Sequence, residues 1–264
     1  MIYAVINQQG GAGKTTLAVH LAVWLHDCGL KVAFVDNDPQ ASASGWIAAA
    51  EPGITLRSLT DAEDLVNQLP SLNDTHDAVV CDGAPRLNDQ THVLMYLAER
   101  IVIPVLPSGL DVRATFQTQQ AVGRVAEARE ADGLPAPWVR LVMNKQRTVG
   151  NQAKLVGRFI KDLGLPLATG QDGKGIGGLG LRDAYAQAVV EDATVGRLAQ
   201  RPRASKSVKA AGVEMDALFE TLTQPQSQVA PPAPPTVTVT ATADDLPQPK
   251  TPSQPQPTPP AHAA

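Results

Sequence analysis

The N-terminal stretch IYAVINQQGGAGKTTLAVH, residues 2–20, decides the fold class. An aliphatic run leads into a glycine-rich loop, and an apolar helical pattern follows. Glycines let the backbone fold closely around a phosphate, while the loop amides and the N-terminus of the following helix face the anion. In such a loop Lys14 reaches the β- and γ-phosphates and the Thr15 hydroxyl binds magnesium. The sequence therefore predicts a P-loop that binds ATP and Mg2+, although Gln8 stands where the strict Walker A pattern has glycine.

Further aliphatic runs follow the loop and alternate with helical patterns. Near-continuous aliphatic runs are typical of parallel strands that are buried on both faces. Strands are predicted at Ile2–Asn7, Lys31–Asp36, Asp77–Asp82, Ile101–Leu106, Trp138–Asn144 and Leu165–Ala168. Helices are predicted at 15–28, 61–69, 88–99, 112–130, 150–163, 182–192 and 205–222. We expect a doubly wound, mostly parallel α/β sheet with helices on both faces.

Composition divides the chain near residue 224. Of the 22 prolines, 12 lie in the last 40 residues, among Gln, Thr, Ala and Ser. Such a segment buries too little apolar surface to offset its ordering entropy. We therefore expect an ATPase domain at 1–224 and a disordered, proline-rich tail at 225–264.

Three further patterns concern the location of the protein, its cysteines and the start of one helix. No leader pattern and no apolar run long enough to span a bilayer is visible, so we expect a cytoplasmic protein. Cys28 and Cys81 fall within apparent core elements and are expected to be buried thiols. The spacing of Thr60 and Glu63 predicts a capping box at the start of the second helix.

Acidic residues stand where two of the predicted strands end. Asp36 ends the second strand, Asp38 follows it, and Asp82 ends the third. Because the carboxyl ends of parallel strands line one crevice, these side chains should converge on the P-loop. Asp82 suits a Walker B residue that holds magnesium through water. Asp38 is placed to orient the attacking water.

In order and spacing, these motifs resemble the ParA-type partition ATPases, a deviant Walker A family. The resemblance covers about residues 1–222 and is closest to the small ParF-like plasmid partition ATPases. It rests on NQQGGAGKTT at 7–16, VDNDPQ at 35–40, DGAP at 82–85, IPVLPSGLD at 103–111 and LRDAY at 181–185.

The resemblance implies a cytoplasmic, nucleoid-associated ATP switch. Two ATP-bound subunits would form a face-to-face homodimer that binds double-stranded DNA without sequence preference. A small DNA-binding or cargo adaptor protein would stimulate hydrolysis. Mapped by motif, the nucleotide-binding residues are Gly10, Gly11, Ala12, Gly13, Lys14, Thr15 and Thr16. Lys14 and Asp38 would act in hydrolysis, Thr15, Asp36 and Asp82 would form the magnesium site, and Asn144 is a candidate for recognising adenine.

One position departs from the family pattern. The family's signature lysine precedes the Gly-Gly pair and reaches the phosphates of the other subunit, but this chain has Gln9 there. Glutamine donates hydrogen bonds but carries no charge, so it should stabilise developing negative charge far less. Three interpretations stay open: slow hydrolysis, replacement by another cation such as Arg86, or a protein that works mainly as an ATP-binding switch.

Charge is distributed unevenly between the two halves. Residues 1–99 carry 4 basic and 12 acidic side chains, whereas residues 100–224 carry 17 basic and 12 acidic. One acid-free segment holds Arg197, Arg201, Arg203, Lys206 and Lys209. Phosphate contact with DNA needs cations but no base readout, so this segment is a candidate DNA-binding surface. A solvated helix end is the equally weighted alternative.

Six glycines crowd the segment at 170–180, where we expect a mobile loop: Gly170, Gly173, Gly175, Gly177, Gly178 and Gly180.

Other functions on this scaffold stay open. A membrane switch would need a basic amphipathic C-terminal helix, and the tail is nearly uncharged, so no membrane partner is expected. A P-loop small-molecule kinase or ligase would need a substrate pocket that the sequence does not reveal. Within the leading interpretation the cargo is a plasmid, a chromosome or a protein microcompartment.

Overall fold

The computed structural model describes residues 1–146, 156–158, 160, 167–168 and 178–224. The side chains of 109–113 and 146 are not described. The predicted tail at 225–264 lies outside these ranges, and so does most of the predicted helix at 150–163.

In this part of the chain, a seven-stranded parallel sheet forms in the order β3-β2-β4-β1-β5-β6-β7. The strands are β1 (Ile2–Val5), β2 (Val32–Asp36), β3 (Thr55–Ser58), β4 (Ala78–Asp82), β5 (Arg100–Val105), β6 (Trp138–Gln146) and β7 (Gly178–Gly180). The chain runs from β1 to one side of it, to β2, β3 and β4, and then crosses to β5 on the other side. The end of β1 is therefore a topological switch point, the usual place for a ligand in such a sheet.

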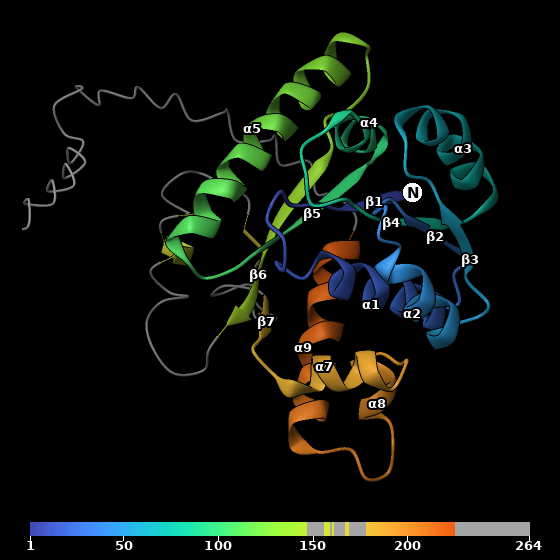
Figure 1. Cartoon of the computed structure of the whole chain (residues 1–264), viewed down its shortest axis with the longest axis vertical. Helices are drawn as coiled ribbons and strands as arrows, with labels where there is room; N and C mark the ends of the chain where they lie inside the picture. Colours follow the sequence, from blue (N-terminus) through green and yellow to red (C-terminus); the bar gives the residue numbers. More distant parts are fainter. Residues whose placement is uncertain (147–155, 159, 161–166, 169–177, 225–264) are drawn as a thin grey trace, which may run out of the picture. The chain divides into compact units, whose positions relative to one another are not determined.

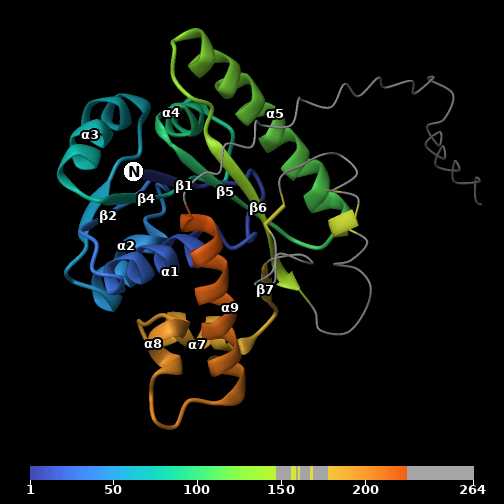
Figure 2. The same cartoon turned by 180° about the vertical axis from the view of Figure 1, so that it is seen from behind.

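Helices cover both faces of the sheet, as Figures 1 and 2 show. One face carries α1 (Lys14–Asp27), α2 (Ser42–Ala50), α7 (Asp183–Val190), α8 (Val195–Ala199) and α9 (Lys206–Thr223). The other carries α3 (Ala62–Thr75), α4 (Asp89–Leu97) and α5 (Gly109–Ala131). Side chains along β1 alternate between the two cores: Tyr3 and Val5 face the first, Ile2 and Ala4 the second. The predicted doubly wound parallel fold is confirmed.

Several elements escaped the sequence prediction. The helix α2 begins after Ala41, whose backbone is left-handed and whose side chain cannot cap it. Its first turn is fixed instead by the distant carboxylate of Asp36, which accepts hydrogen bonds from Ser44. The strand β3 and the short helix α8 were also missed. The strand β7 lies in the predicted glycine loop, because Gly178 and Gly180 pair with β6, whereas residues 169–177 lie outside the described ranges. Of the predicted strand at Leu165–Ala168, Leu167 forms an isolated bridge to Leu141.

Two local predictions were wrong. The N-cap of α3 is Asp61, whose side chain accepts from the amide of Asp64, so the cap lies one residue after Thr60. Cys28 is exposed, because α1 ends at Asp27 and Cys28 is the residue that caps it, whereas Cys81 is buried in β4 as expected. Among the described residues, no helix combines the length and the hydropathy required to cross a membrane.

A buried histidine joins α1 to α8. The Nδ1 atom of His20 lies 2.7 Å from the Thr16 carbonyl oxygen, and its Nε2 accepts from the Val195 amide at 3.1 Å. Since an amide can only donate, Nε2 is the unprotonated nitrogen and Nδ1 carries the proton. Burial lowers the pKa of His20 to about 4. The folded chain therefore keeps this histidine neutral.

His20 should make the fold acid-labile. Between about pH 6.5 and pH 4 the unfolded chain binds a proton that the folded chain refuses, so the free energy of unfolding should fall as pH falls, by about 3 kcal/mol in total. Urea unfolding measured across this range checks it. The variant His20→Gln should lose this part of the pH dependence, whereas His92→Gln on α4 should keep it. Parallel pH profiles for wild type and His20→Gln would contradict the prediction.

Candidate functional site

The loop after β1 has the geometry of an anion cradle. Gly11 and Gly13 adopt left-handed backbone angles, with φ of 74° and 96°. Gly13 is the N-cap of α1 and has no side chain to bind the first amides of the helix. Those amides have no partner within the helix either. The N-terminus of α1 therefore suits a phosphate.

A buried carboxylate closes this site from the neighbouring strand. The Thr15 hydroxyl donates to Oδ2 of Asp82 at 2.6 Å, while Oδ1 of Asp82 is buried and has no hydrogen-bond partner among the described residues. Burial raises the pKa of Asp82 to about 7 against the opposing hydrogen bond from Thr15, and the nearby Asp36 carboxylate adds to the rise. An unpartnered carboxylate oxygen beside a hydroxyl is the donor set that Mg2+ prefers. The residues present therefore fit a magnesium ion.

Lys14 lies at the same place with its amine largely buried. Its Nζ is 3.3 Å from the Gln9 carbonyl oxygen. Burial lowers the pKa of Lys14, although the carboxylates of Asp82 and Asp38 oppose the change. These contributions place Lys14 within electrostatic reach of both carboxylates.

The two acids of the β2 end differ in their contacts. Asp36 is paired with Asp82 across the β2–β4 register, and both of its oxygens are occupied. Oδ1 accepts from the Asp38 amide at 3.2 Å, and Oδ2 accepts from the amide and the hydroxyl of Ser44 at 2.9 and 2.8 Å. Asp38 is half-buried, and its Oδ1 accepts from the Gln40 amide at 3.0 Å. Asp36 thus organises the loop that presents Asp38.

The end of β6 closes over the loop from the other side. Asn144 donates from Nδ2 to the Ala12 carbonyl at 2.7 Å, so in this structure the amide predicted to recognise adenine holds the P-loop. A Cβ on Gly13 would lie 2.1 Å from this nitrogen, which is far inside contact distance. The next residue, Lys145, donates from Nζ to the Gly11 carbonyl at 2.8 Å. Lys145 is therefore a cation in contact with the P-loop, and the sequence analysis did not identify it.

Asn7 is a second residue that the sequence analysis missed. Its side chain is buried, donates to the Pro104 carbonyl at 2.6 Å and accepts from the Gln9 amide at 3.2 Å. It thereby joins the ends of β1 and β5 to the start of the loop. Asn7 ends the predicted strand Ile2–Asn7 and Lys145 directly follows the predicted strand Trp138–Asn144, and this place at a strand end is the signal that could have found them.

The remaining predicted residues lie in or beside the loop. Gln8 and Gly10 are exposed, Gln9 and Thr16 are half-buried, and Ala12 is buried. Arg86 is exposed, and its backbone carbonyl accepts from the Thr91 hydroxyl at 2.6 Å. In the described part of the chain, no hydrogen bond or ion pair joins the Arg86 side chain to the loop. The structure thus brings Lys145, and not Arg86, into contact with the P-loop.

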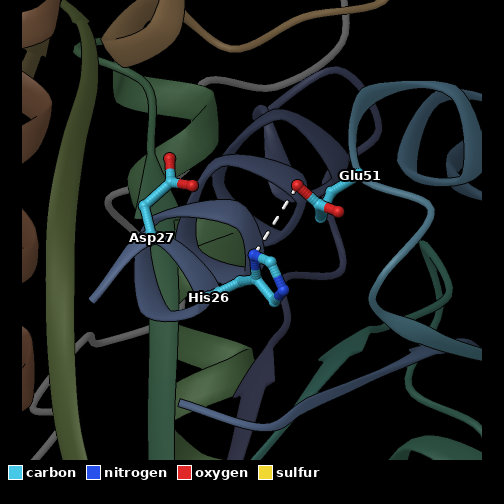
Figure 3. A group of neighbouring side chains, drawn as sticks. All are labelled: His26, Asp27 and Glu51. Atoms are coloured by element: carbon cyan, nitrogen blue, oxygen red, sulfur yellow. Dashed lines mark ion pairs between the residues drawn. The ribbon is translucent and has the colours of Figure 1, made fainter. Parts of the chain in front are cut away.

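The predicted basic segment is divided by its ion pairs. Arg197 binds Asp27 and Glu51, with nitrogen–oxygen distances of 2.7 and 2.5 Å. Figure 3 shows these two acids with His26, whose Nδ1 is 3.6 Å from Glu51 Oε2. The three side chains lie close enough to hold a metal, but the Arg197 guanidinium already bridges the two carboxylates.

The other four cations of the segment are more accessible. Arg201 is paired with Glu191. Arg203, Lys206 and Lys209 are exposed and form no ion pair with the described acids. These three cations precede or begin α9, and they form the part of the segment that is free to meet an anionic partner.

Known proteins resemble this chain in sequence and in fold. A family model described as the CobQ/CobB/MinD/ParA nucleotide binding domain matches residues 3–195. The chain is similar to "Maintenance of carboxysome distribution protein A" of Halothiobacillus neapolitanus, with 32% identity over 206 residues, 76% of this chain and 89% of that protein. It is also similar to the chromosome-partitioning ATPase Soj of Thermus thermophilus, with 33% identity over 132 residues, 39% of this chain and 53% of that protein. Among solved structures, that of a Cyanothece McdA–ATP complex superposes with a TM-score of 0.64 at 16% identity, over 85% of this chain and 97% of that one.

Gly13 should tolerate no side chain. The variant Gly13→Ala should lower the free energy of unfolding by about 2 kcal/mol or more, since an L residue pays about 1–2 kcal/mol in left-handed backbone and the new Cβ displaces Asn144. Gly10→Ala is the matched control, because a Cβ there meets nothing within 4 Å, and its effect should stay within about 0.5 kcal/mol. Urea unfolding of both variants checks this, and equal effects would contradict it.

Proposed function

The chain belongs to the CobQ/CobB/MinD/ParA nucleotide-binding family of P-loop NTPases, and on this premise we propose that it is an ATP-dependent positioning switch. As a homodimer with ATP, it would bind double-stranded DNA without sequence preference and hydrolyse ATP to partition or position a large cargo. The observation that carries the proposal is the joining of Lys14, Thr15, Asp38 and Asp82 at the uncapped start of α1. Such a switch acts in the cytoplasm, on the nucleoid.

The proposed roles follow from the contacts. The amides from Gly10 to Thr16 would bind the phosphates, and the buried Lys14 would neutralise their charge. Thr15 and Asp82 would hold magnesium, which when bound neutralises phosphate charge. Asp36 would act one step away, since both of its oxygens are already used to position the Asp38 loop. Asp38, half-buried and near Lys14, would orient the attacking water.

Lys145 is our candidate for the cation that compensates for Gln9. Its Nζ lies 2.8 Å from the carbonyl of Gly11, within the loop that would enclose the phosphates. The amine is exposed and its partner is a neutral carbonyl, so it can exchange that partner for a phosphate oxygen at little cost. Of the three interpretations left open at Gln9, this contact favours replacement by another cation.

The nature of the cargo is proposed from the relatives. The H. neapolitanus protein is named for carboxysome distribution, and the similarity extends over most of both chains. This favours a protein microcompartment as the cargo, with a plasmid or a chromosome as the second candidate, in view of the partition ATPases among the relatives. In either case a small adaptor protein would stimulate hydrolysis. A small-molecule kinase or ligase is the competing function. Because such an enzyme would not depend on DNA, ATP turnover measured with and without DNA separates the two functions.

Binding of DNA should require ATP and the free cations of the basic segment. We expect the wild-type protein to bind double-stranded DNA of random sequence in the presence of ATP. Binding should be lost without nucleotide and in the variant Lys14→Ala. Changing Arg203, Lys206 and Lys209 to Glu should weaken binding more than tenfold and reduce the slope of log K against log salt by about 0.9 per lost phosphate contact. The matched control changes the exposed Lys31, Arg57 and Arg124 to Glu. Equal effects of the two triple variants would show that another surface binds DNA.

Hydrolysis should depend on the charge near Gln9. We expect Gln9→Lys to raise the ATP turnover rate about tenfold or more, because a cation stabilises the developing charge better than an amide. Lys145→Ala should lower turnover in wild type and have a smaller effect in the Gln9→Lys background. Lys31→Ala serves as the control, and ATP affinity is measured in parallel. Equal turnover in wild type and Gln9→Lys, with and without DNA, would mean that the site is not handicapped.

A further inference from the structure

The turn at Ala193–Val195, called here the coupling turn, is held by side chains from two other helices. His20 of α1 accepts from the Val195 amide, as described above, and Val195 is the first residue of α8. Trp46 of α2 donates from Nε1 to the Ala193 carbonyl at 2.9 Å. The two rings meet edge to face, with their centroids 5.4 Å apart. The coupling turn thus has one buried partner from α1 and one from α2.

The helix α1 begins in the proposed nucleotide site, and α2 begins beside it. The first turn of α1 contains Lys14 and Thr15, and it also contains Thr16, whose carbonyl accepts the Nδ1 proton of His20. The first turn of α2 is bound to Asp36 through Ser44. Any shift of either helix start on nucleotide binding is therefore carried along a rigid helix to His20 or to Trp46.

Beyond the coupling turn lies the basic segment. The helix α8 packs closely on α9, since a Cβ on Gly212 of α9 would lie 2.9 Å from the Ala199 Cβ. Arg203 lies in the loop between these two helices, and Lys206 begins α9. Because α8 and α9 are closely packed at Ala199 and Gly212, we expect a shift of α8 to move the loop between them as well. Asp192, which precedes the coupling turn, has the left-handed φ of 47° that is common just after a helix end, and the amides of Asp192 and Ala193 donate to the carbonyls of Val189 and Ala188 at the end of α7.

We propose that His20 and Trp46 are positioning residues that couple nucleotide binding to the DNA affinity of the segment around Arg203. This inference rests on the proposed function, because it assumes that the nucleotide controls DNA binding. It assigns that control to a defined buried contact. His20 meets the nucleotide site at its edge, through the Thr16 carbonyl, and in the described part of the chain no hydrogen bond joins His20 or Trp46 to the cations around Arg203.

Two substitutions at one position separate coupling from simple packing. His20→Gln keeps an acceptor near the place of Nε2 for the Val195 amide, whereas His20→Asn is too short to reach it and can keep only the contact with Thr16. We expect ATP affinity to change less than threefold in both. The ratio of DNA affinities with and without ATP should fall at least fivefold in His20→Asn, the lower end of usual coupling factors of about 5–150, and should be largely retained in His20→Gln.

Trp46→Phe tests the other contact. It keeps an aromatic ring beside His20 but removes the hydrogen bond to Ala193, so the same ratio should fall. It also keeps the proposal testable if His20→Asn fails to fold. His92→Asn on α4, on the opposite face of the sheet, should leave the ratio unchanged. A wild-type ratio in both His20→Asn and Trp46→Phe would overturn the proposal.

Amide hydrogen exchange separates this inference from the proposed function. In wild type, ATP should slow exchange at 195–199, and in His20→Asn it should not. If wild type never binds DNA but ATP still protects α8, the proposed function fails and the link stands. If ATP leaves exchange at α8 unchanged in wild type, the link itself is refuted, whatever the DNA result.

Discussion

The hydrogen bond from the Thr15 hydroxyl to the buried carboxylate of Asp82 joins the start of α1 to the end of β4, and the site is arranged around it. Burying a carboxylate is costly unless it is bonded, and here one oxygen is satisfied by the protein while the other is not. Parallel packing makes this possible, because β1, β2 and β4 are neighbours whose carboxyl ends meet at one edge. The unpaired oxygen of Asp82 is therefore a consequence of the fold that a cation can satisfy.

Sequence and structure agree where the residues of one element decide its structure, and they differ where contacts between separate elements do. The aliphatic runs of β1, β2 and β4 and the acids that end two of them could be predicted, since burial on both faces demands such runs. The helix α2 could not, because its start depends on Asp36, eight residues before Ser44. Nor could the division of the basic segment, since Arg197 is bound by Asp27 and Glu51, which lie 170 and 146 residues away in the chain. Motif reading placed Asn144 at the nucleotide site, but its bond to Ala12 is visible only in three dimensions.

The charges of the site are unbalanced in the described structure. Asp36, Asp38 and Asp82 lie near a single P-loop lysine, Lys14, whose own charged form is disfavoured by burial. In a medium of low dielectric such an excess of negative charge opposes the approach of a polyphosphate unless cations come with it. A nucleotide that arrives as its magnesium complex would remove this objection, since the cation would offset the negative charge of the acids and the phosphates. By the same argument, every further cation near the loop would favour phosphate binding, and Gln9 does not supply one.

A chain with Gln9 can still work as a switch if the positive charge that is missing at position 9 is supplied elsewhere in the chain. A trans-acting lysine at position 9 would deliver its charge when two subunits meet, which ties charge delivery to dimerisation. Lys145 is tied to the loop of its own subunit through Gly11, and its left-handed backbone, with φ of 52°, aims it there from the end of β6. A cation held in this way would stabilise bound phosphate in the monomer as well as in the proposed dimer. A positive charge supplied by Lys145 on β6, and not by a lysine at position 9, would then stabilise nucleotide binding itself more than the dimer contact. Dimerisation alone would in that case raise the hydrolysis rate by less.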